Sequence, residues 1–311
     1  MDVDLAIVAF GLGVGLLVGM TGIGGGSLMT PLLILVFGVK PVTAVGTDLA
    51  YGAVTKTVGG WRHLRQGTVD MKLSTWMALG SVPAAIGGVY VLDVLERSYG
   101  KDFDELLITL LAIALLLTGV MTLARALFLK KLHGRERDSV EMTTRTKLSA
   151  VGLGCVVGFV LGVTSAGSGA LIAVGLILLF QLVPTRVVGT DVFHAAVLLW
   201  AATAAHLVAG NVDFALAGNI LLGSVPGVWV GSSLSVRVPT AALRTTLAIV
   251  LLGSGLGLLA KAGTGVPGAV LGAFPVAVAA VIIAVTVRDR RRRAGARPDA
   301  APEVTEPVAS R

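Results

Sequence analysis

A short motif occurs twice in this chain, and its recurrence constrains the fold more than any other feature. Val45-Gly46-Thr47-Asp48 returns as Val188-Gly189-Thr190-Asp191, 143 residues later. The same offset relates matching residues without a gap, among them Thr21 and Thr164, Gly24 and Gly167, Pro41 and Pro184, His63 and His206, Asp70 and Asp213, and Pro83 and Pro226. A constant offset over such a length indicates an internal duplication, so the fold should contain two similar units.

The composition places both units in a membrane. Charged residues make up 14% of the chain and hydrophobic residues 55%, whereas a soluble domain carries about 25% charged residues. A membrane-spanning helix needs about 20 apolar residues. Each copy has four apolar blocks, at residues 5–38, 41–61, 72–92 and 104–127 in the first and at 147–182, 185–208, 214–236 and 241–261 in the second.

The sequence therefore predicts an all-α polytopic membrane protein built from two repeats. We divide the chain into transmembrane repeat one, a cytoplasmic loop, transmembrane repeat two, an additional transmembrane helix and a basic, disordered cytoplasmic tail, at residues 1–130, 131–146, 147–262, 263–287 and 288–311. The tail is assigned as disordered because it is rich in Pro, Ala and charged residues and poor in apolar ones.

The first block of each copy is interrupted by small residues. The interruptions are Thr21-Gly22-Ile23-Gly24-Gly25-Gly26-Ser27 and Thr164-Ser165-Ala166-Gly167-Ser168-Gly169. Unwound backbone survives at membrane depth only where protein or a wet cavity satisfies its polar groups. We therefore predict a broken or re-entrant first helix in each repeat, made of two short helices that enter and leave on the same side. Two full spans per block stay an open alternative.

Lysine and arginine are unequally divided between the two sides of this topology. Re-entrant first blocks give each copy an odd number of crossings, so the two repeats are inverted relative to each other. With the N-terminus outside, twenty of the 25 Lys and Arg residues fall inside and four fall outside, namely Lys40, Arg97, Lys101 and Lys261. This bias predicts a multi-pass protein of the cytoplasmic membrane with an outside N-terminus and a cytoplasmic C-terminus.

Inverted repeats with discontinuous helices are the architecture of secondary transporters. A helix that restarts after such a break presents unpaired N–H groups and a partial positive charge, which favour an anion. The competing interpretation is that small residues only let helices pack closely. The predicted substrate-binding residues are Thr21, Gly22, Gly24, Gly25, Gly26, Ser27, Lys56, Thr164, Ser165, Gly167, Ser168 and Gly169.

Four further polar residues lie at membrane depth, where charges are costly and usually face a cavity or a partner. Asp48 and Asp191 are repeat mates that either cap a broken helix, which we favour, or bind a coupling proton. Lys56 has Leu199 as its mate and could neutralise an anion, pair with Asp48 or extend toward the headgroups. His194 could relay protons, although a hydrogen-bonded core histidine is the commoner case.

The two breaks, each followed by a Gly-Thr-Asp motif, resemble the TauE/SafE sulfite exporter family. The resemblance covers roughly residues 5–262, and its clearest carriers are Gly22 to Ser27, Pro41, Gly46-Thr47-Asp48, Gly189-Thr190-Asp191 and Pro226. It implies a multi-pass transporter of sulfite, organosulfonates or related small sulfur-containing anions. The second copy departs from the glycine-rich form, with Ser165, Ala166 and Ser168 in place of Gly22, Ile23 and Gly25.

Other classes of function lack their sequence signals. Cys155 is the only cysteine and the four histidines show no paired spacing, so neither a disulfide framework nor a metal site is expected. We expect no enzyme, no cofactor and no nucleic-acid partner, only a small anionic substrate and the lipid bilayer. The prediction is a secondary transporter working by alternating access, with export favoured. The alternatives are a permease for another small anion or organic acid, and a non-transporting sensor or assembly component.

Overall fold

The computed structural model describes residues 3–21, 26–127, 137–235, 240–263 and 273. Its elements are α1 (Leu5–Thr21), α2 (Gly26–Val36), α3 (Pro41–Arg65), α4 (Met71–Tyr99), the short 3-10 helix η1 (Gly100–Asp102), α5 (Phe103–Leu127), α6 (Thr144–Thr164), α7 (Ser168–Phe180), α8 (Pro184–Val208), α9 (Phe214–Ser235) and α10 (Thr240–Lys261). Nearly all of the predicted helix at 263–287, the whole tail at 288–311, and residues 131–136 of the predicted loop lie outside the described residues.

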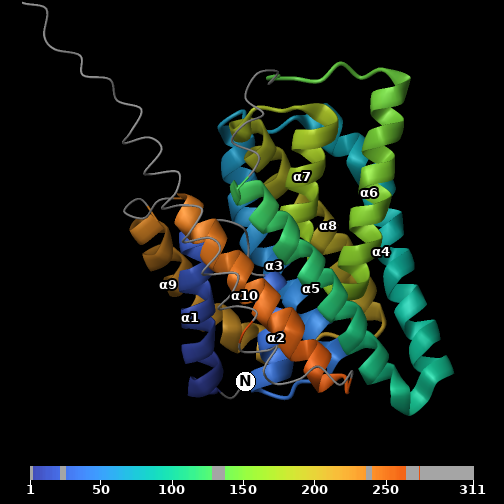
Figure 1. Cartoon of the computed structure of the whole chain (residues 1–311), viewed down its shortest axis with the longest axis vertical. Coiled ribbons are helices and arrows are strands. Elements are labelled where there is room, and N and C mark those ends of the chain that lie inside the picture. Colours follow the sequence, from blue (N-terminus) through green and yellow to red (C-terminus); the bar gives the residue numbers. More distant parts are fainter. Residues whose placement is uncertain (1–2, 22–25, 128–136, 236–239, 264–272, 274–311) are drawn as a thin grey trace, which may run out of the picture.

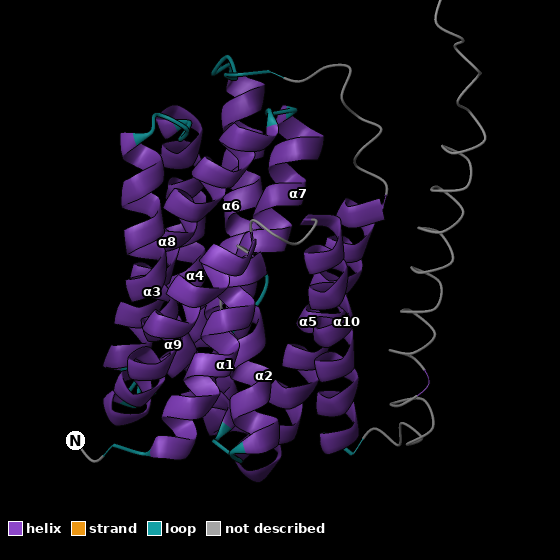
Figure 2. Cartoon of the chain, turned by 90° about the vertical axis from the view of Figure 1, so that its left-hand side faces the viewer, coloured by secondary structure: helices purple, strands orange, loops and turns teal. Residues whose placement is uncertain are grey.

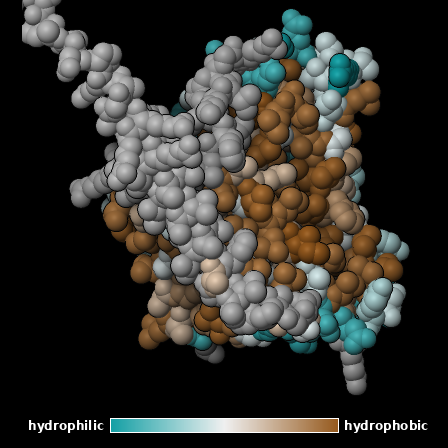
Figure 3. Space-filling model, viewed as in Figure 1, coloured by the Kyte–Doolittle hydropathy of each residue, from teal (hydrophilic) through white to brown (hydrophobic). Residues whose placement is uncertain are grey.

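The described elements form a helical bundle with an apolar exterior, as Figures 1 and 2 show. Five of them, α4, α5, α6, α8 and α9, contain stretches long and apolar enough to cross a membrane, and shorter apolar stretches lie in α1, α2, α7 and α10. Large apolar side chains such as Val58, Tyr90 and Trp229 are exposed on the helices. Figure 3 shows apolar residues across the middle of one face and hydrophilic ones toward its upper and lower ends. The chain is therefore a multi-pass helical membrane protein.

Helix pairing follows the same pattern in both halves of the chain. The most extensive contacts join α1 to α9, α4 to α6, α5 to α10 and α3 to α8. The repeats relate α1 to α6, α3 to α8, α4 to α9 and α5 to α10. Exchanging the two repeats therefore turns the α1–α9 pair into the α6–α4 pair, and it leaves the α3–α8 and α5–α10 pairs unchanged. In Figures 1 and 2, α1 and α2 lie toward one end of the bundle, and α6 and α7 lie toward the other. Two inverted units would give this arrangement, and their orientation in a bilayer stays a prediction.

Glycines allow the closest of these helix contacts. A Cβ atom at Gly15 of α1 would overlap the Ser224 carbonyl oxygen of α9, and one at its repeat mate Gly158 of α6 would overlap that of Ser81 in α4. Small residues that bring two backbones together are a common means of packing helices in lipid. Within α1 and α6, outside the breaks, these glycines therefore allow close helix packing.

Three hydrogen bonds show which loops lie next to one another. At one end, the Arg186 guanidinium at the start of α8 donates to the carbonyl oxygen of Gly67, at 2.7 Å. The Arg137 N–H before α6 donates to the Gln181 carbonyl oxygen at the end of α7, at 2.8 Å. Lys261 donates from Nζ to the Ile34 carbonyl oxygen near the end of α2, at 2.7 Å. The loops predicted inside thus meet one another, and Lys261, predicted outside, joins the end of α2.

Candidate functional site

The break in the second repeat is a tight turn between α6 and α7. Ser165 and Gly167 have φ angles of 55° and 93°, in the left-handed region that ends many helices. The Thr164 hydroxyl donates to the Val160 carbonyl oxygen at 2.6 Å and accepts the Ala166 N–H at 3.2 Å. Thr164 therefore closes the end of α6, while Ser165 and Gly167 face other elements.

This turn meets α2 and α3 of the first repeat. The Ser165 hydroxyl donates to Oδ2 of Asp48 in α3 at 2.8 Å, and the Gly167 N–H donates to Oγ of Ser27 in α2 at 3.5 Å. Thr30, one turn after Ser27, donates from Oγ1 to the same Asp48 oxygen at 2.7 Å. The start of α2, which follows the first break, and the turn of the second break therefore lie in direct contact.

We call Ser27, Thr30, Asp48, Ser165 and the Gly167 N–H the central polar cluster. Its side chains are buried, with exposed fractions of 7%, 1%, 0% and 1% for Ser27, Thr30, Asp48 and Ser165. The first-turn N–H groups of α7, like those of any α-helix, lack intrahelical partners and carry the positive end of the helix dipole. Among the described residues, the one that precedes α7 is Gly167, which has no side chain to cap them. Polar groups buried in this way are costly, which marks the cluster as the candidate functional site.

The Gly-Thr-Asp motifs hold the cluster's supporting helices in place. The Thr47 hydroxyl accepts the Asp213 N–H before α9 at 3.0 Å, and its mate Thr190 accepts the Asp70 N–H before α4 at 2.9 Å. A Cβ atom at Gly46 would overlap the carbonyl oxygen of Asn211 in the loop before α9. Each motif therefore binds the loop that precedes α4 or α9 of the other repeat.

Comparison with known proteins identifies the family of this chain. The family model described as sulfite exporter TauE/SafE matches residues 7–258. The chain belongs to the TauE/SafE family.

Curated relatives of the chain are named as probable membrane transporters. A probable membrane transporter protein, YjnA of Bacillus subtilis (strain 168), is 39% identical over 256 residues, covering 82% of this chain and 100% of the relative. The probable membrane transporter proteins YdhB and YunE of the same organism are 29% and 26% identical, each over 79% of this chain and over 96% and 92% of their own lengths. No solved structure matches the chain. This TauE/SafE protein is thus a membrane transporter by family.

The structure brings together only some of the residues that the sequence proposes for substrate. Ser27, Ser165 and Gly167 lie in the central polar cluster. Gly26 and Gly169 lie in the first turns of α2 and α7, and Thr164 bonds to backbone instead of facing the cluster. Three other residues of the breaks lie outside the described residues, namely Gly22, Gly24 and Gly25. The backbones of Thr21 and Ser168 are described, but their side chains are not.

Lys56 is separate from the cluster. It lies near the middle of α3, with 8% of its surface exposed, and its Nζ has no hydrogen-bond partner among the described residues. It forms no ion pair with Asp48 in the described part of the chain, because eight residues of helix separate the two by about 12 Å along the axis. A lysine that reached the headgroups would expose its ammonium, so the contacts favour a buried cation over that alternative.

The two aspartates are not equivalent. The hydroxyls that bind Asp48 come from Thr30 and Ser165, and the residues that correspond to these two at the repeat offset are Ala173 and Gly22. Asp191 lies in α8 and is also buried. Asp48 is therefore bonded to side-chain hydroxyls, where the sequence favoured helix capping for both aspartates.

His194 lies elsewhere, between α8 and α4. Its Nε2 is 3.1 Å from Oγ of Ser81, and the whole side chain is buried. This contact is the hydrogen-bonded core histidine that the sequence analysis gives as the commoner case. The proton-relay role stays a prediction.

The sequence analysis missed Thr30, although a signal for it existed. Thr30 follows Ser27 by three positions, which places both hydroxyls on one face of α2. Thr118 of α5 was missed as well: its Oγ1 lies 3.4 Å from where a Cβ on Gly167 would be, and it donates to the Ala114 carbonyl oxygen. Hydroxyls on helices outside the breaks thus contribute to the candidate site.

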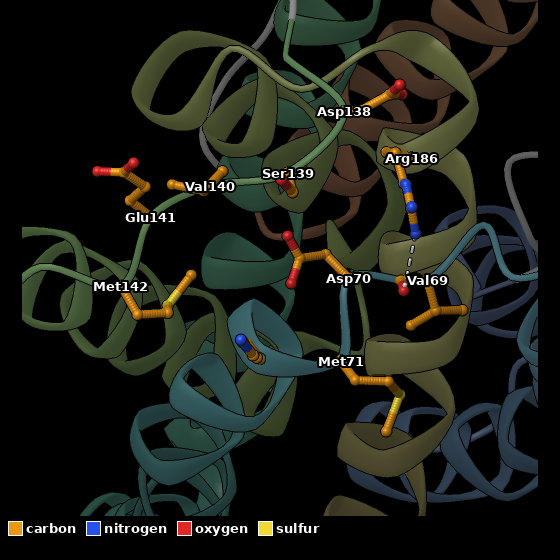
Figure 4. A pocket seen from close by; sticks show the side chains of 10 residues that line it. Val69, Asp70, Met71, Asp138, Ser139, Val140, Glu141, Met142 and Arg186 are labelled. Atoms are coloured by element: carbon orange, nitrogen blue, oxygen red, sulfur yellow. Dashed lines mark hydrogen bonds between the residues drawn. The ribbon is translucent and has the colours of Figure 1, made fainter.

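A second polar region lies at the end of the bundle, in the pocket of Figure 4. This pocket of about 590 Å³ is lined by residues 69–72 and 138–142 and by Arg186. Its charges are of both signs and are partly engaged: Asp70 caps α4 by accepting the Leu73 N–H at 3.1 Å, and Arg186 bonds to the loop carbonyl oxygens. The central polar cluster is therefore the better candidate for an anion.

Proposed function

We propose that this TauE/SafE protein is a secondary transporter that moves a small sulfur-containing anion, such as sulfite or an organosulfonate, across the cytoplasmic membrane, with export favoured. The observation that carries the proposal is the contact between the two helix breaks, in which the Gly167 N–H meets Ser27 and Ser165 meets Asp48. Broken helices that converge in the interior of a bundle are typical of secondary transporters.

The groups near the contact suit an anion. The beginning of α7 offers N–H groups that the residue before it does not cap, and helix N-termini bind sulfate, phosphate and carboxylate readily. Ser27 Oγ accepts the Gly167 N–H, and its hydroxyl proton has no acceptor among the described residues, so it can donate to a bound oxygen. The buried ammonium of Lys56 adds a positive charge to the interior. Sulfite and sulfonates present several acceptor oxygens to such donors.

The division of the cluster between repeats supports alternating access. Ser27, Thr30 and Asp48 belong to the first repeat, whereas Ser165 and Gly167 belong to the second. A rigid movement of one repeat against the other would change these contacts directly, which is how many transporters expose a site to each side in turn.

The proposal is tested by flux in proteoliposomes with sulfite, methanesulfonate, thiosulfate and sulfate as separate substrates. We expect flux of sulfite or methanesulfonate, outward under an outward gradient. Ser27→Ala should lower it about tenfold or more, since a lost hydrogen bond to an ion is worth about 1.5–3 kcal/mol. Ser98→Ala is the matched control, because Ser98 is exposed and only bonds the Val94 carbonyl oxygen. Folded protein that moves none of the four anions would contradict the proposal.

A further inference from the structure

Three oxygen atoms in the central polar cluster lie within hydrogen-bond distance of one another. Thr30 Oγ1 and Ser165 Oγ are 2.7 Å and 2.8 Å from Asp48 Oδ2, and they are 2.6 Å from each other. All three distances are in the range of O–H···O hydrogen bonds. The atoms therefore form a triangle with a hydrogen bond along each side.

The number of protons in this triangle fixes the state of Asp48. Three hydrogen bonds need three protons, and the hydroxyls of Thr30 and Ser165 supply two. With an ionised Asp48, both hydroxyls would donate to Oδ2, and their own oxygens would face each other at 2.6 Å with no hydrogen between them. With a proton on Asp48 Oδ2 the ring is complete: Oδ2 donates to one hydroxyl, that hydroxyl donates to the other, and only the second one still donates to Oδ2.

The surroundings of Asp48 agree with a neutral carboxyl group. Its Oδ1 is buried without a hydrogen-bond partner, and no cation is paired with it among the residues that the structure describes. An ionised carboxylate buried in this way would be strongly destabilising.

Among the described residues, the helices packed against α3 place no charged side chain in hydrogen-bond contact with Asp48. They are α8, α2, α9 and α5. α2 and α9 contain no titratable side chain, and those of α5 lie in its first and last turns. Tyr51 on α3 is the neighbouring titratable group. The remaining groups of α3 and α8, none of which bonds to Asp48 in the described contacts, are Lys56, Arg62, His63, Arg65, Arg186, Asp191, His194 and His206.

The sequence does not repeat this pair of hydroxyls in the other half of the chain. At the repeat offset, Thr30 and Ser165 correspond to Ala173 and Gly22. Val192 lies against Gly59, which puts Asp191 level with the second half of α3, about 16 Å along that helix from Asp48. The pair of hydroxyls that forms the ring with Asp48 is therefore specific to the first repeat motif in the sequence.

We propose that Asp48 carries a proton on Oδ2 and is the group that couples anion transport to proton movement. The inference rests on the proposed function. On release, the O–H bond breaks, the proton passes to the aqueous phase open at that stage, and the carboxylate keeps both hydroxyls as donors. Thr30 and Ser165 then share no hydrogen and separate, which loosens a contact between the two repeats.

The same geometry links binding of the anion to protonation of Asp48. An ionised Asp48 would repel an anion at the beginning of α7, so anion and proton occupy the cluster together. Such a carrier exports the anion whenever the outward anion gradient exceeds the inward proton gradient.

Infrared spectroscopy of the purified protein tests the protonation without any substrate. Wild type should show a C=O band of a neutral carboxyl group at neutral pH that is lost in Asp48→Asn and retained in Asp191→Asn. Ser165→Ala, which leaves the carboxyl in place, should move the band because one hydrogen-bond partner is gone. A folded Asp48→Asn protein with an unchanged carboxyl band would overturn the proposal, whether or not an anion is transported.

Transport tests the coupling. Methanesulfonate keeps its charge across the pH range, so any pH dependence belongs to the protein. An inward proton gradient should raise its uptake severalfold in wild type and in Asp104→Asn, whose side chain is exposed at the start of α5. The gradient should have no effect in Asp48→Asn, and Ser165→Ala should move the pH profile to more alkaline values, because the carboxylate has lost a donor. Equal gradient stimulation in Asp48→Asn and wild type would refute coupling while leaving the transporter proposal intact.

Discussion

The packing of α6 against α4 leads to a stability prediction with an internal control. Gly158 and Gly152 lie on the same helix, but only Gly158 faces α4. A Cβ atom at Gly158 would lie 2.6 Å from Ser81 Cα and 2.7 Å from its carbonyl carbon, whereas one at Gly152 would meet nothing within 4 Å. Ordinary carbon contacts are about 3.5–4.0 Å, so Gly158→Ala requires the two helices to separate by about 1 Å.

The magnitude follows from two terms. Overpacking costs about 1–3 kcal/mol, and Gly158 should lie in the upper half of that range because the atoms it meets belong to the backbone. Both substitutions gain the same helix propensity, about 1 kcal/mol. The difference between the two variants is therefore the clash alone, about 2–3 kcal/mol, or roughly 3–5 °C in melting temperature for a chain of 311 residues.

The assay is thermal unfolding of both variants in one detergent, followed by tryptophan fluorescence and by the fraction remaining monodisperse. We expect Gly152→Ala at or above wild type and Gly158→Ala clearly below it. Melting temperatures that coincide, or a more stable Gly158→Ala, would refute the packing argument. Gly15→Ala and Gly13→Ala should repeat the contrast on α1, because a Cβ at Gly15 would meet α9 and one at Gly13 would meet nothing within 4 Å.

Two further predictions concern residues that the sequence singled out. Thr47→Val and Thr190→Val should each lower the stability by about 1 kcal/mol in the same thermal assay, because each removes the acceptor for one loop N–H, of Asp213 and Asp70; unequal losses would contradict the equivalence of the two motifs. Lys56→Met should leave a folded protein of equal or greater stability whose anion flux falls at least about tenfold, because it removes a buried positive charge that has no hydrogen-bond partner among the described residues and that attracts the anion into the interior. Flux at the wild-type level would reduce Lys56 to a structural residue.

Much of the fold follows from local sequence properties. Hydropathy and the Gly-Ser clusters predict the helices and the breaks, since span length and helix interruption depend on residues that are neighbours in the chain. The roles of Gly46 and Thr47 could not be predicted in this way. Their partners, Asn211 and Asp213, lie in a loop of the other repeat, and only the packed structure brings that loop to them.

The sequence predicted only part of the central polar cluster, because the remaining contacts join residues that are far apart in the chain. Ser27, Ser165 and Gly167 lie in the breaks themselves, where the sequence signal is strong. Thr30 and the pairing of its hydroxyl with Asp48 depend on how α2 and α3 are rotated about their axes, which hydropathy alone does not determine. For Lys56 the sequence left three alternatives, and the structure argues against two of them, because the ammonium is buried and has no hydrogen-bond partner among the described residues.

The central claim is that the anion binds where the two helix breaks meet, and cysteine protection tests it most directly. In a Cys155→Ser background, Ser27→Cys places a single thiol in the cluster and Ser98→Cys places one on the exposed surface of α4. Alkylation by a small maleimide is then timed with and without methanesulfonate, which does not react with it. The account predicts slower alkylation at position 27 in the presence of methanesulfonate and no change at position 98. Equal alkylation rates at position 27, at concentrations that saturate transport, would contradict it.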